Sequence, residues 1–240
     1  MTSRQDVIAL YANQVNGVHR HSTEEFYQLE AREKVFHMGP GGVAMDFGCG
    51  TADLLAWYAK HFDAMVGVDI SDNMLKHADA RLKKMGVANV TLQQADDLSV
   101  WPWLGERRFD VITSAAVMQY FSAPQIGQFL ANAKAHLAPG GRIVMFDIVD
   151  PRIYWLFKYG WFAPGPMTAP QVLRALARSA KMLAKGLAKK LALRPRADLM
   201  GTTHHPAAIE RQAADAGYDV RFVRSMYYEY RYHALLTPKV

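Results

Sequence analysis

A short glycine-rich stretch directly after an apolar run is the part of the sequence best suited to ligand chemistry. It reads Asp46-Phe47-Gly48-Cys49-Gly50-Thr51-Ala52 and follows Val43–Met45. Glycines allow a tight turn and let a ligand approach the backbone closely, and the N–H groups at the start of the following helix attract an anionic group. Such turns are also common for structural reasons alone, so this one by itself indicates no more than a nucleotide-like ligand.

An acid at the end of the next apolar run narrows the kind of ligand. Asp69 follows Met65–Val68, where a carboxylate can accept hydrogen bonds from both hydroxyls of a ribose. A dinucleotide site would look similar, but it favours a glycine three residues after the second glycine of the loop, and Asp53 stands there. Asp46 would also repel a pyrophosphate, whereas it could order the ammonium group of an amino acid tail. A nicotinamide dinucleotide is therefore the alternative ligand.

The elements that must position these residues alternate in type along the chain. Short apolar runs predict strands at Val43–Asp46, Met65–Asp69, Val90–Leu92, Phe109–Thr113 and Arg142–Phe146. Amphipathic stretches predict helices at about 52–61, Asp72–Met85 and Pro124–Leu137, with a further helix at Pro206–Gly217 and strands at Asp219–Val223 and Tyr227–Leu236. This alternation implies parallel strands, and we expect an α/β fold with a Rossmann-like, doubly wound sheet of seven strands, helices on both faces, and a helical insertion before the last two strands.

Composition limits where the protein works. A chain of 240 residues that is 50% hydrophobic can bury one main core. Cys49 is the single cysteine, so no disulfide forms within the chain. Met1–Leu10 lacks the apolar segment of a signal peptide, and no apolar run reaches the roughly 18 residues of a membrane-spanning helix. We expect a cytoplasmic protein that, if it meets a membrane, lies on its inner face.

The positive charge is concentrated in one segment. Residues 151–200 hold ten Lys or Arg against one acid, a local net charge of +9, while the other 190 residues sum to −3. The segment opens with aromatic residues and continues as a predicted helix from Pro170 to Leu193, with basic and apolar residues on different faces. The basic face holds Arg174, Arg178, Lys181, Lys185 and Lys189, and the apolar face holds Val172, Leu176, Leu183, Leu187 and Leu191.

Three interpretations of this insertion stay open. Such a helix can lie in an anionic membrane interface, anchored by Trp155, Phe157 and Trp161. It can equally be a lid whose apolar face packs on the catalytic domain. Nucleic acid is an unlikely partner, because more dispersed basic residues would be expected for it.

Four sequence elements together resemble the class I S-adenosylmethionine-dependent methyltransferases, over about Val43–Asp150. They are the glycine loop, Val68-Asp69-Ile70-Ser71 with Asn73-Met74-Leu75, Ala95-Asp96-Asp97-Leu98 after the third strand, and Leu137-Ala138-Pro139-Gly140-Gly141-Arg142 before the fifth. The loop departs from the family pattern at Ala52, where a third glycine is common, and a methyl group there is a mild change. The resemblance implies S-adenosylmethionine as the cofactor and S-adenosylhomocysteine as its product.

The resemblance also implies a set of cofactor-binding residues. These are Asp46, Gly48 and Gly50 at the methionine moiety, Asp69 at the ribose, Ile70 and Met74 beside the adenine, Asp96 or Asp97 at its amino group, and Ser114 and Ala115 near the sulfonium. Each has a structural alternative. Asp69 could cap the next helix, although Ser71 and Asp72 suit that role better, and Asp96 and Asp97 could be turn acids.

Catalysis and acceptor binding leave weaker signals. Methyl transfer from a sulfonium is an in-line displacement that depends largely on alignment, but a hydroxyl acceptor must also lose a proton, which favours a nearby histidine. His204 and His205 are the candidate catalytic bases, with a helix entry before Pro206 as the competing interpretation. The candidate acceptor-binding residues are Tyr11, His19 and Tyr120, with His21 beside them, and the two tyrosines could equally belong to the core.

The sequence thus predicts a methyltransferase with four parts. They are an N-terminal helical cap (1–42), a cofactor-binding core (43–150), a basic aromatic insertion (151–200), and a C-terminal helix with strands that complete the sheet (201–240). We expect O-methylation of a small-molecule, glycan or lipid-linked acceptor. Asp147 and Asp150 bring no set of metal ligands with them, and Ser114–Val117 lacks the motif typical of nucleobase methylation. The alternatives are an NAD-dependent oxidoreductase and a non-catalytic cofactor-binding protein.

Overall fold

The computed structural model describes residues 23–163, 165–191 and 201–239. Seven strands form one sheet in the order β3-β2-β1-β4-β5-β7-β6. Their bounds are β1 Val43–Phe47, β2 Ala64–Asp69, β3 Val90–Gln94, β4 Phe109–Ala115, β5 Leu137–Val149, β6 Tyr218–Arg224 and β7 Arg231–Pro238. The strand order reverses between β1 and β4, where the carboxyl ends of an open α/β sheet leave a crevice for a ligand.

The predicted seven-stranded α/β fold is confirmed. Strands β1 to β5 pair in parallel, as the alternation of strands and helices implied. Strand β7, which lies beyond that alternation, pairs antiparallel with both β5 and β6. The reason is the short connection of residues 225–230 between β6 and β7, which allows a hairpin but no crossover.

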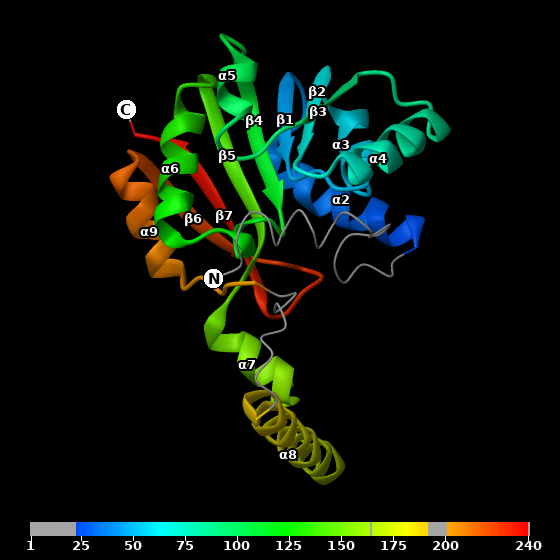
Figure 1. Cartoon of the computed structure of the whole chain (residues 1–240), viewed down its shortest axis with the longest axis vertical. Helices are drawn as coiled ribbons and strands as arrows, with labels where there is room; N and C mark the ends of the chain where they lie inside the picture. The colour runs from blue at the N-terminus through cyan, green and yellow to red at the C-terminus, as the bar shows by residue number, and fades with distance from the viewer. Residues whose placement is uncertain (1–22, 164, 192–200, 240) are drawn as a thin grey trace.

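Helices cover both faces of the sheet (Figure 1). Their bounds are α2 Glu24–Met38, α3 Leu55–Tyr58, α4 Asp72–Lys84, α5 Val100–Leu104, α6 Ala123–Lys134, α7 Pro151–Tyr159, α8 Ala169–Leu191 and α9 Pro206–Asp215, with 3-10 turns η1 Ala59–His61 and η2 Met118–Tyr120. Buried side chains of α2, α3 and α4 pack on one face, and those of α5, α6 and α9 on the other. The helix predicted over 52–61 is shorter and divided, and neither α5 nor α7 was predicted.

A buried ionic contact fastens α2 to the sheet. The Nζ of Lys34 lies 3.0 Å from Glu30 Oε1 and 3.0 Å from Asp147 Oδ2, and all three side chains are fully buried. Asp147 sits in β5 where its register with β7 shifts, and it adopts a left-handed conformation with a φ of 58°. This bulge turns the aspartate out of the regular ladder.

His233 of β7 continues this contact as a neutral ring. Its Nδ1 accepts the backbone N–H of Asp147 (3.1 Å), and its Nε2 lies 3.2 Å from Glu33 Oε1. The Nε2 therefore bears the proton, since Nδ1 is the acceptor. The charged side chains of Glu30, Glu33 and Lys34, of which the last two follow the first by three and four residues on α2, thus face the protein interior.

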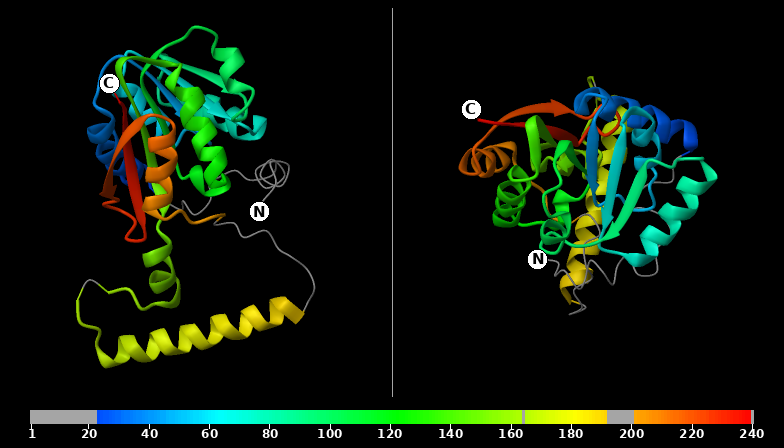
Figure 2. Two further views of the ribbon diagram at one scale, coloured as in Figure 1. Left: turned by 90° about the vertical axis from the view of Figure 1, so that its left-hand side faces the viewer. Right: turned by 90° about the horizontal axis from the view of Figure 1, so that it is seen from above.

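Helices α7 and α8 extend away from the sheet (Figures 1 and 2). Helix α8 covers the stretch in which the sequence predicted a cationic helix, whereas the aromatic segment before it forms α7. Among the described elements, α8 packs mainly against α7. The two helices therefore form an arm, attached to the core through α7.

Candidate functional site

The glycine loop is tied to the end of the neighbouring strand. Gly48 and Gly50 adopt left-handed conformations with φ of 79° and 56°. The N–H groups of Gly48 and Cys49 both donate to the carbonyl of Val68, at 2.7 and 2.9 Å. A Cβ on Gly48 would overlap the side chain of Val117, so only glycine fits there, whereas a Cβ on Gly50 would meet no atom within 4 Å. Gly50 thus borders open space in which a ligand can approach the backbone.

Asp69 joins this loop to the start of α4. Its Oδ2 accepts the N–H of Gly50 (2.8 Å), and its Oδ1 accepts the N–H of Ser71 (2.9 Å). Burial raises the pKa of the Asp69 carboxyl, although these N–H groups act in the opposite direction. Helix α4 is capped by Ser71, whose Oγ accepts the N–H of Met74 (3.3 Å). Asp69 therefore does not cap the helix, and its carboxylate lies at the carboxyl ends of β1 and β2.

The other acid and the thiol near the loop are buried. Asp46 lies in β1 with a buried side chain. Burial, followed by the nearby carboxylates of Asp69 and Asp46, raises the pKa of the Cys49 thiol well above its usual value. Burial thus favours the protonated thiol, which is the less reactive form of cysteine.

Of the residues predicted at the adenine, Asp96 has a local structural role. Its Oδ1 accepts the N–H groups of Leu98 (3.0 Å) and Ser99 (2.8 Å), and the hydroxyl of Ser99. Asp97 accepts the indole N–H of Trp101 through its carbonyl (2.8 Å). Asp96 thus stabilises the turn before α5, which is the structural role that was the alternative to an adenine contact. An adenine contact by either acid stays a prediction.

Ile70 and Met74, the residues predicted to flank the adenine, differ in exposure. Ile70 is half-buried, and its carbonyl accepts the amide of Gln94 (3.2 Å). Met74 is almost fully buried. Ile70 is therefore the more accessible of the two at this edge, and both contacts stay predictions.

Two buried polar side chains lie near the end of β4, the strand that adjoins β1 where the strand order reverses. Ser114 lies at the end of β4 and Gln119 in η2, and both are nearly inaccessible. Neither Ser114 Oγ nor Gln119 Oε1 has a hydrogen-bond partner among the described residues. Because burying an oxygen without a partner is costly, these atoms are candidates for contact with a ligand. Ser114 and its half-buried neighbour Ala115 were predicted, whereas Gln119 was missed because no motif marks it.

The two candidate bases both make structural hydrogen bonds. His204 is buried, its Nε2 lies 2.9 Å from the carbonyl of Met118, and burial lowers its pKa. His205 is the N-cap of α9, and its Nδ1 accepts the N–H of Ala207 (3.1 Å). This is the helix entry that competed with a catalytic role. Catalysis by either ring stays a prediction.

The residues predicted to bind the acceptor are described only in part. Tyr120 belongs to η2 and packs, half-buried, against the core on the α6 side of the sheet. Tyr11, His19 and His21 lie outside the described residues. Of these candidates, only Tyr120 lies among the described residues, and it belongs to η2 together with Gln119.

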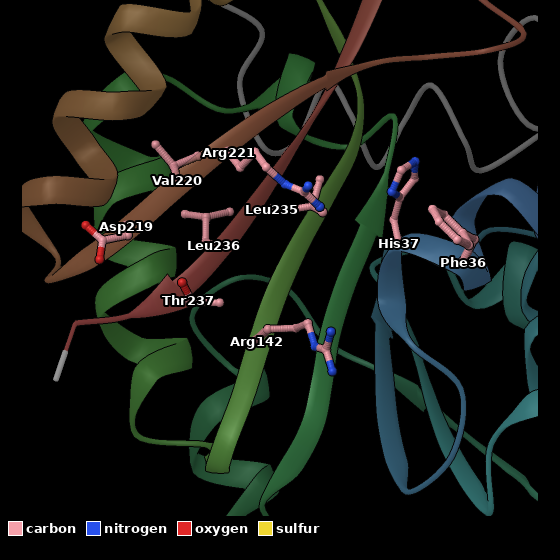
Figure 3. A pocket seen from close by; sticks show the side chains of 9 residues that line it. All are labelled: Phe36, His37, Arg142, Asp219, Val220, Arg221, Leu235, Leu236 and Thr237. Atoms are coloured by element: carbon pink, nitrogen blue, oxygen red, sulfur yellow. The ribbon is translucent and has the colours of Figure 1, made fainter.

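A groove of about 450 Å³ lies at another place in the fold (Figure 3). His37 at the end of α2, Arg142 near the start of β5 and Arg221 of β6 border it, with Leu235 of β7 between them. Arg142 is level with Ala44, near the amino end of β1, through the pairing of both with Val111, whereas the glycine loop follows the carboxyl end of β1. The groove is therefore separate from the predicted cofactor site.

Comparison with known proteins identifies the domain. Residues 44–141 match the family described as a methyltransferase domain. The dTDP-3-amino-3,4,6-trideoxy-alpha-D-glucopyranose N,N-dimethyltransferase of Streptomyces venezuelae is 31% identical over 121 residues, 49% of this chain and 46% of that protein. The demethylmenaquinone methyltransferase of Staphylococcus carnosus is 30% identical over 131 residues, 53% of this chain and 52% of that protein. The chain spans about half the length of these relatives.

Solved structures show the same fold. The structure of Streptomyces venezuelae DesVI has a TM-score of 0.58 at 20% identity, covering 88% of this chain and 92% of that one. The magnesium protoporphyrin IX methyltransferase of Synechocystis PCC 6803 with bound SAM has a TM-score of 0.62 at 14% identity, covering 98% and 96%. At these identities the likeness shows the fold, and it extends beyond the domain to nearly the whole chain.

Proposed function

We propose that this chain, whose residues 44–141 match a methyltransferase domain, is a class I S-adenosylmethionine-dependent methyltransferase that transfers a methyl group to a hydroxyl of a small-molecule, glycan or lipid-linked acceptor. The observation that best supports the cofactor is the link between Asp69 and Gly50 at the reversal of strand order. It places a carboxylate and an accessible glycine backbone side by side at the carboxyl ends of β1 and β2.

The residues of this site suit S-adenosylmethionine. The cofactor, when bound, supplies a methyl group already activated on a sulfonium. Each oxygen of Asp69 accepts one N–H group and keeps a second lone pair, with which it can accept a ribose hydroxyl. Gly50 leaves room at the backbone for the amino acid end, and Asp46 is near enough to the loop to favour its ammonium.

Ser114 and Gln119 suit the acceptor side. Both have a buried oxygen without a partner among the described residues. Ser114 is near the end of β4 and Gln119 is in η2 just after it, and β4 adjoins β1 at the reversal. A hydroxyl-bearing acceptor could donate to Gln119 Oε1, which would orient its oxygen and remove the cost of leaving that atom unpaired. Alignment of this kind is the main requirement of the reaction. His204 and His205 remain the predicted bases.

Calorimetry with S-adenosylmethionine tests the cofactor assignment. We expect the wild type to bind and Asp69→Ala to bind at least about tenfold more weakly, because hydrogen bonds to a charged group contribute roughly 1.5–3 kcal/mol. Asp72→Ala is the matched control, since Asp72 is exposed on the next helix and pairs with Lys76. Absence of binding by the wild type, or equal losses in both variants, would reject the assignment.

Two measurements separate the alternatives. An NAD-dependent oxidoreductase would be stabilised thermally by NAD rather than by S-adenosylmethionine. A non-catalytic binding protein would bind S-adenosylmethionine but yield no labelled product from any acceptor. The acceptor panel should include amino sugars and quinones, because relatives are named for methylating a dTDP-amino sugar and demethylmenaquinone.

The proposed function also includes the place where the protein acts. No helix among the described residues is long and apolar enough to cross a membrane. We place the enzyme at the periphery of an anionic membrane, on the evidence of the arm formed by α7 and α8.

A further inference from the structure

The arm, residues 151–163 and 165–191, exposes apolar side chains that no other described part of the chain covers. Helix α7 packs on the flank of α8, where Ala175 is buried and the indole N–H of Trp161 donates to Ser179 Oγ (3.0 Å). Three leucines of α8 lie on another flank. Leu173, Leu176 and Leu183 are 67%, 51% and 68% exposed. The apolar face of α8 is thus not the face that holds it to α7.

The opposite face of α8 is basic. At 100° per residue, Arg174, Arg178 and Lys181 lie about half a turn from the centre of the three leucines. All three basic side chains are exposed, and none has an ion-pair partner among the described residues. The sequence from 151 to 191 contains no Asp or Glu at all. An apolar stripe backed by uncompensated positive charge calls for a surface that is both apolar and anionic.

Exposed aromatic residues lie at the base of the arm. Trp155 and Leu156 of α7 are each 48% exposed, and Trp161 in the connection to α8 is 37% exposed. The Nζ of Lys158 lies 4.8 Å from the centre of the Trp155 ring. Tryptophan favours the boundary between lipid headgroups and acyl chains, and lysine can extend from there to the phosphates.

We infer, building on the peripheral location in the proposed function, that the arm binds the interface of an anionic lipid bilayer. The leucines of α8 and the tryptophans enter the headgroup region, while the basic face stays at the level of the phosphates. The charge argues for a lipid rather than a protein occupant. The arm needs neither methyl transfer nor cofactor for this, so vesicle binding and catalysis can each fail without the other.

Vesicle co-sedimentation of the full chain tests this inference. We expect binding to phosphatidylcholine vesicles containing about one-third phosphatidylglycerol, and at least tenfold weaker binding to pure phosphatidylcholine. The triple variant Arg174→Gln, Arg178→Gln, Lys181→Gln and the triple variant Leu173→Ser, Leu176→Ser, Leu183→Ser should each lose at least tenfold in affinity. Calorimetry should show unchanged S-adenosylmethionine binding in both, which also proves that they fold.

Matched controls sit elsewhere on the surface. Lys76→Gln with Lys83→Gln removes exposed lysines of α4, and Leu29→Ser with Phe36→Ser removes exposed apolar side chains of α2. Both should bind vesicles like the wild type. Equal binding to neutral and anionic vesicles would overturn the inference, as would arm variants that bind normally. A leucine variant that only turns a dimer into a monomer would show that a second copy covers the stripe, and would also overturn it.

Discussion

At the scale of single residues, Asp69 links stability to cofactor binding. Its buried carboxylate holds the N–H groups of Gly50 and Ser71, and burial raises its pKa above the usual 3.8. Since the folded pKa exceeds the unfolded one, ionisation of Asp69 reduces the stability of the unliganded protein as the pH rises through this window. In the proposed site the ionised form is the better acceptor of ribose hydroxyls, so we expect cofactor binding to offset part of this cost.

A pH prediction follows for Asp69. The affinity for S-adenosylmethionine should fall as the pH is lowered, beginning at a higher pH than an exposed aspartate would allow, because protonation removes the accepting carboxylate. Calorimetry between about pH 7.5 and 5 measures this. Asp69→Asn should bind weakly at every pH with a flat profile, while Asp72→Asn should follow the wild type. A wild-type affinity that rises on acidification would contradict the role.

His205 allows a capping role to be separated from a catalytic one. Its Nδ1 accepts the N–H of Ala207 at the start of α9. His205→Ala should therefore lower the free energy of unfolding by about 1 kcal/mol, whereas His205→Ser, which restores an accepting oxygen, should stay close to the wild type. Urea unfolding checks both. If His205→Ser folds normally and still loses methyl transfer, the imidazole has a catalytic role after all.

Sequence spacing could predict the cofactor side of the site but not its acceptor side. Gly48, Gly50 and Asp69 meet because a glycine turn and an acid at a strand end follow from local patterns. Ser114, by contrast, was predicted from the family resemblance. Gln119 and the contacts of His204 could not be predicted, since they depend on how residues 201–204 lie against η2, where Thr202 and His204 bind carbonyls far away in sequence.

At the scale of elements, the position of α2 depends on one buried lysine. Lys34→Met should lower the free energy of unfolding by about 3–5 kcal/mol, because it leaves the carboxylates of Glu30 and Asp147 in the interior without their cation. Denaturant titration measures the loss. Lys76→Met, which removes an equivalent pair with Asp72 on the surface, should change stability by no more than about 1 kcal/mol. Equal effects would mean that burial of the first pair is unimportant.

The elements themselves were predictable where one periodicity dominates. Strands β1 to β5 and helices α4, α6 and α8 follow apolar runs or amphipathic repeats. The charged side chains of Glu30, Glu33 and Lys34 would suit a solvated helix face, and their burial is explained by partners distant in sequence, on β5, on β7 and in the connection between β6 and β7. Helix α7 was missed because its aromatic residues occupy more than one helix face, so that no single apolar stripe stands out. Tyr154 and Phe157, one turn apart, pack on Tyr230.

At the scale of the whole molecule, charge and shape divide the chain in the same way. The segment 151–200 has a net charge of +9 and the remaining 190 residues −3. The described part of the basic segment extends away from the sheet (Figures 1 and 2). The glycine loop and Asp69 instead belong to the core, at the carboxyl ends of β1 and β2. Salt should therefore affect the binding of the two proposed ligands, S-adenosylmethionine and an anionic membrane, very differently. Screening weakens contacts between exposed charges and hardly affects buried ones.

Raising sodium chloride from about 50 mM to about 500 mM shortens the screening length from roughly 14 Å to about 4 Å. We expect affinity for anionic vesicles to fall on the order of tenfold or more, since exposed residues such as Arg174, Arg178 and Lys181 face the lipid charge through water. Affinity for S-adenosylmethionine should change by no more than about twofold, because Asp69 acts at short range and is shielded from solvent. Vesicle binding that ignores salt would show that the leucines act alone, and a parallel fall in cofactor affinity would show that the two sites are coupled.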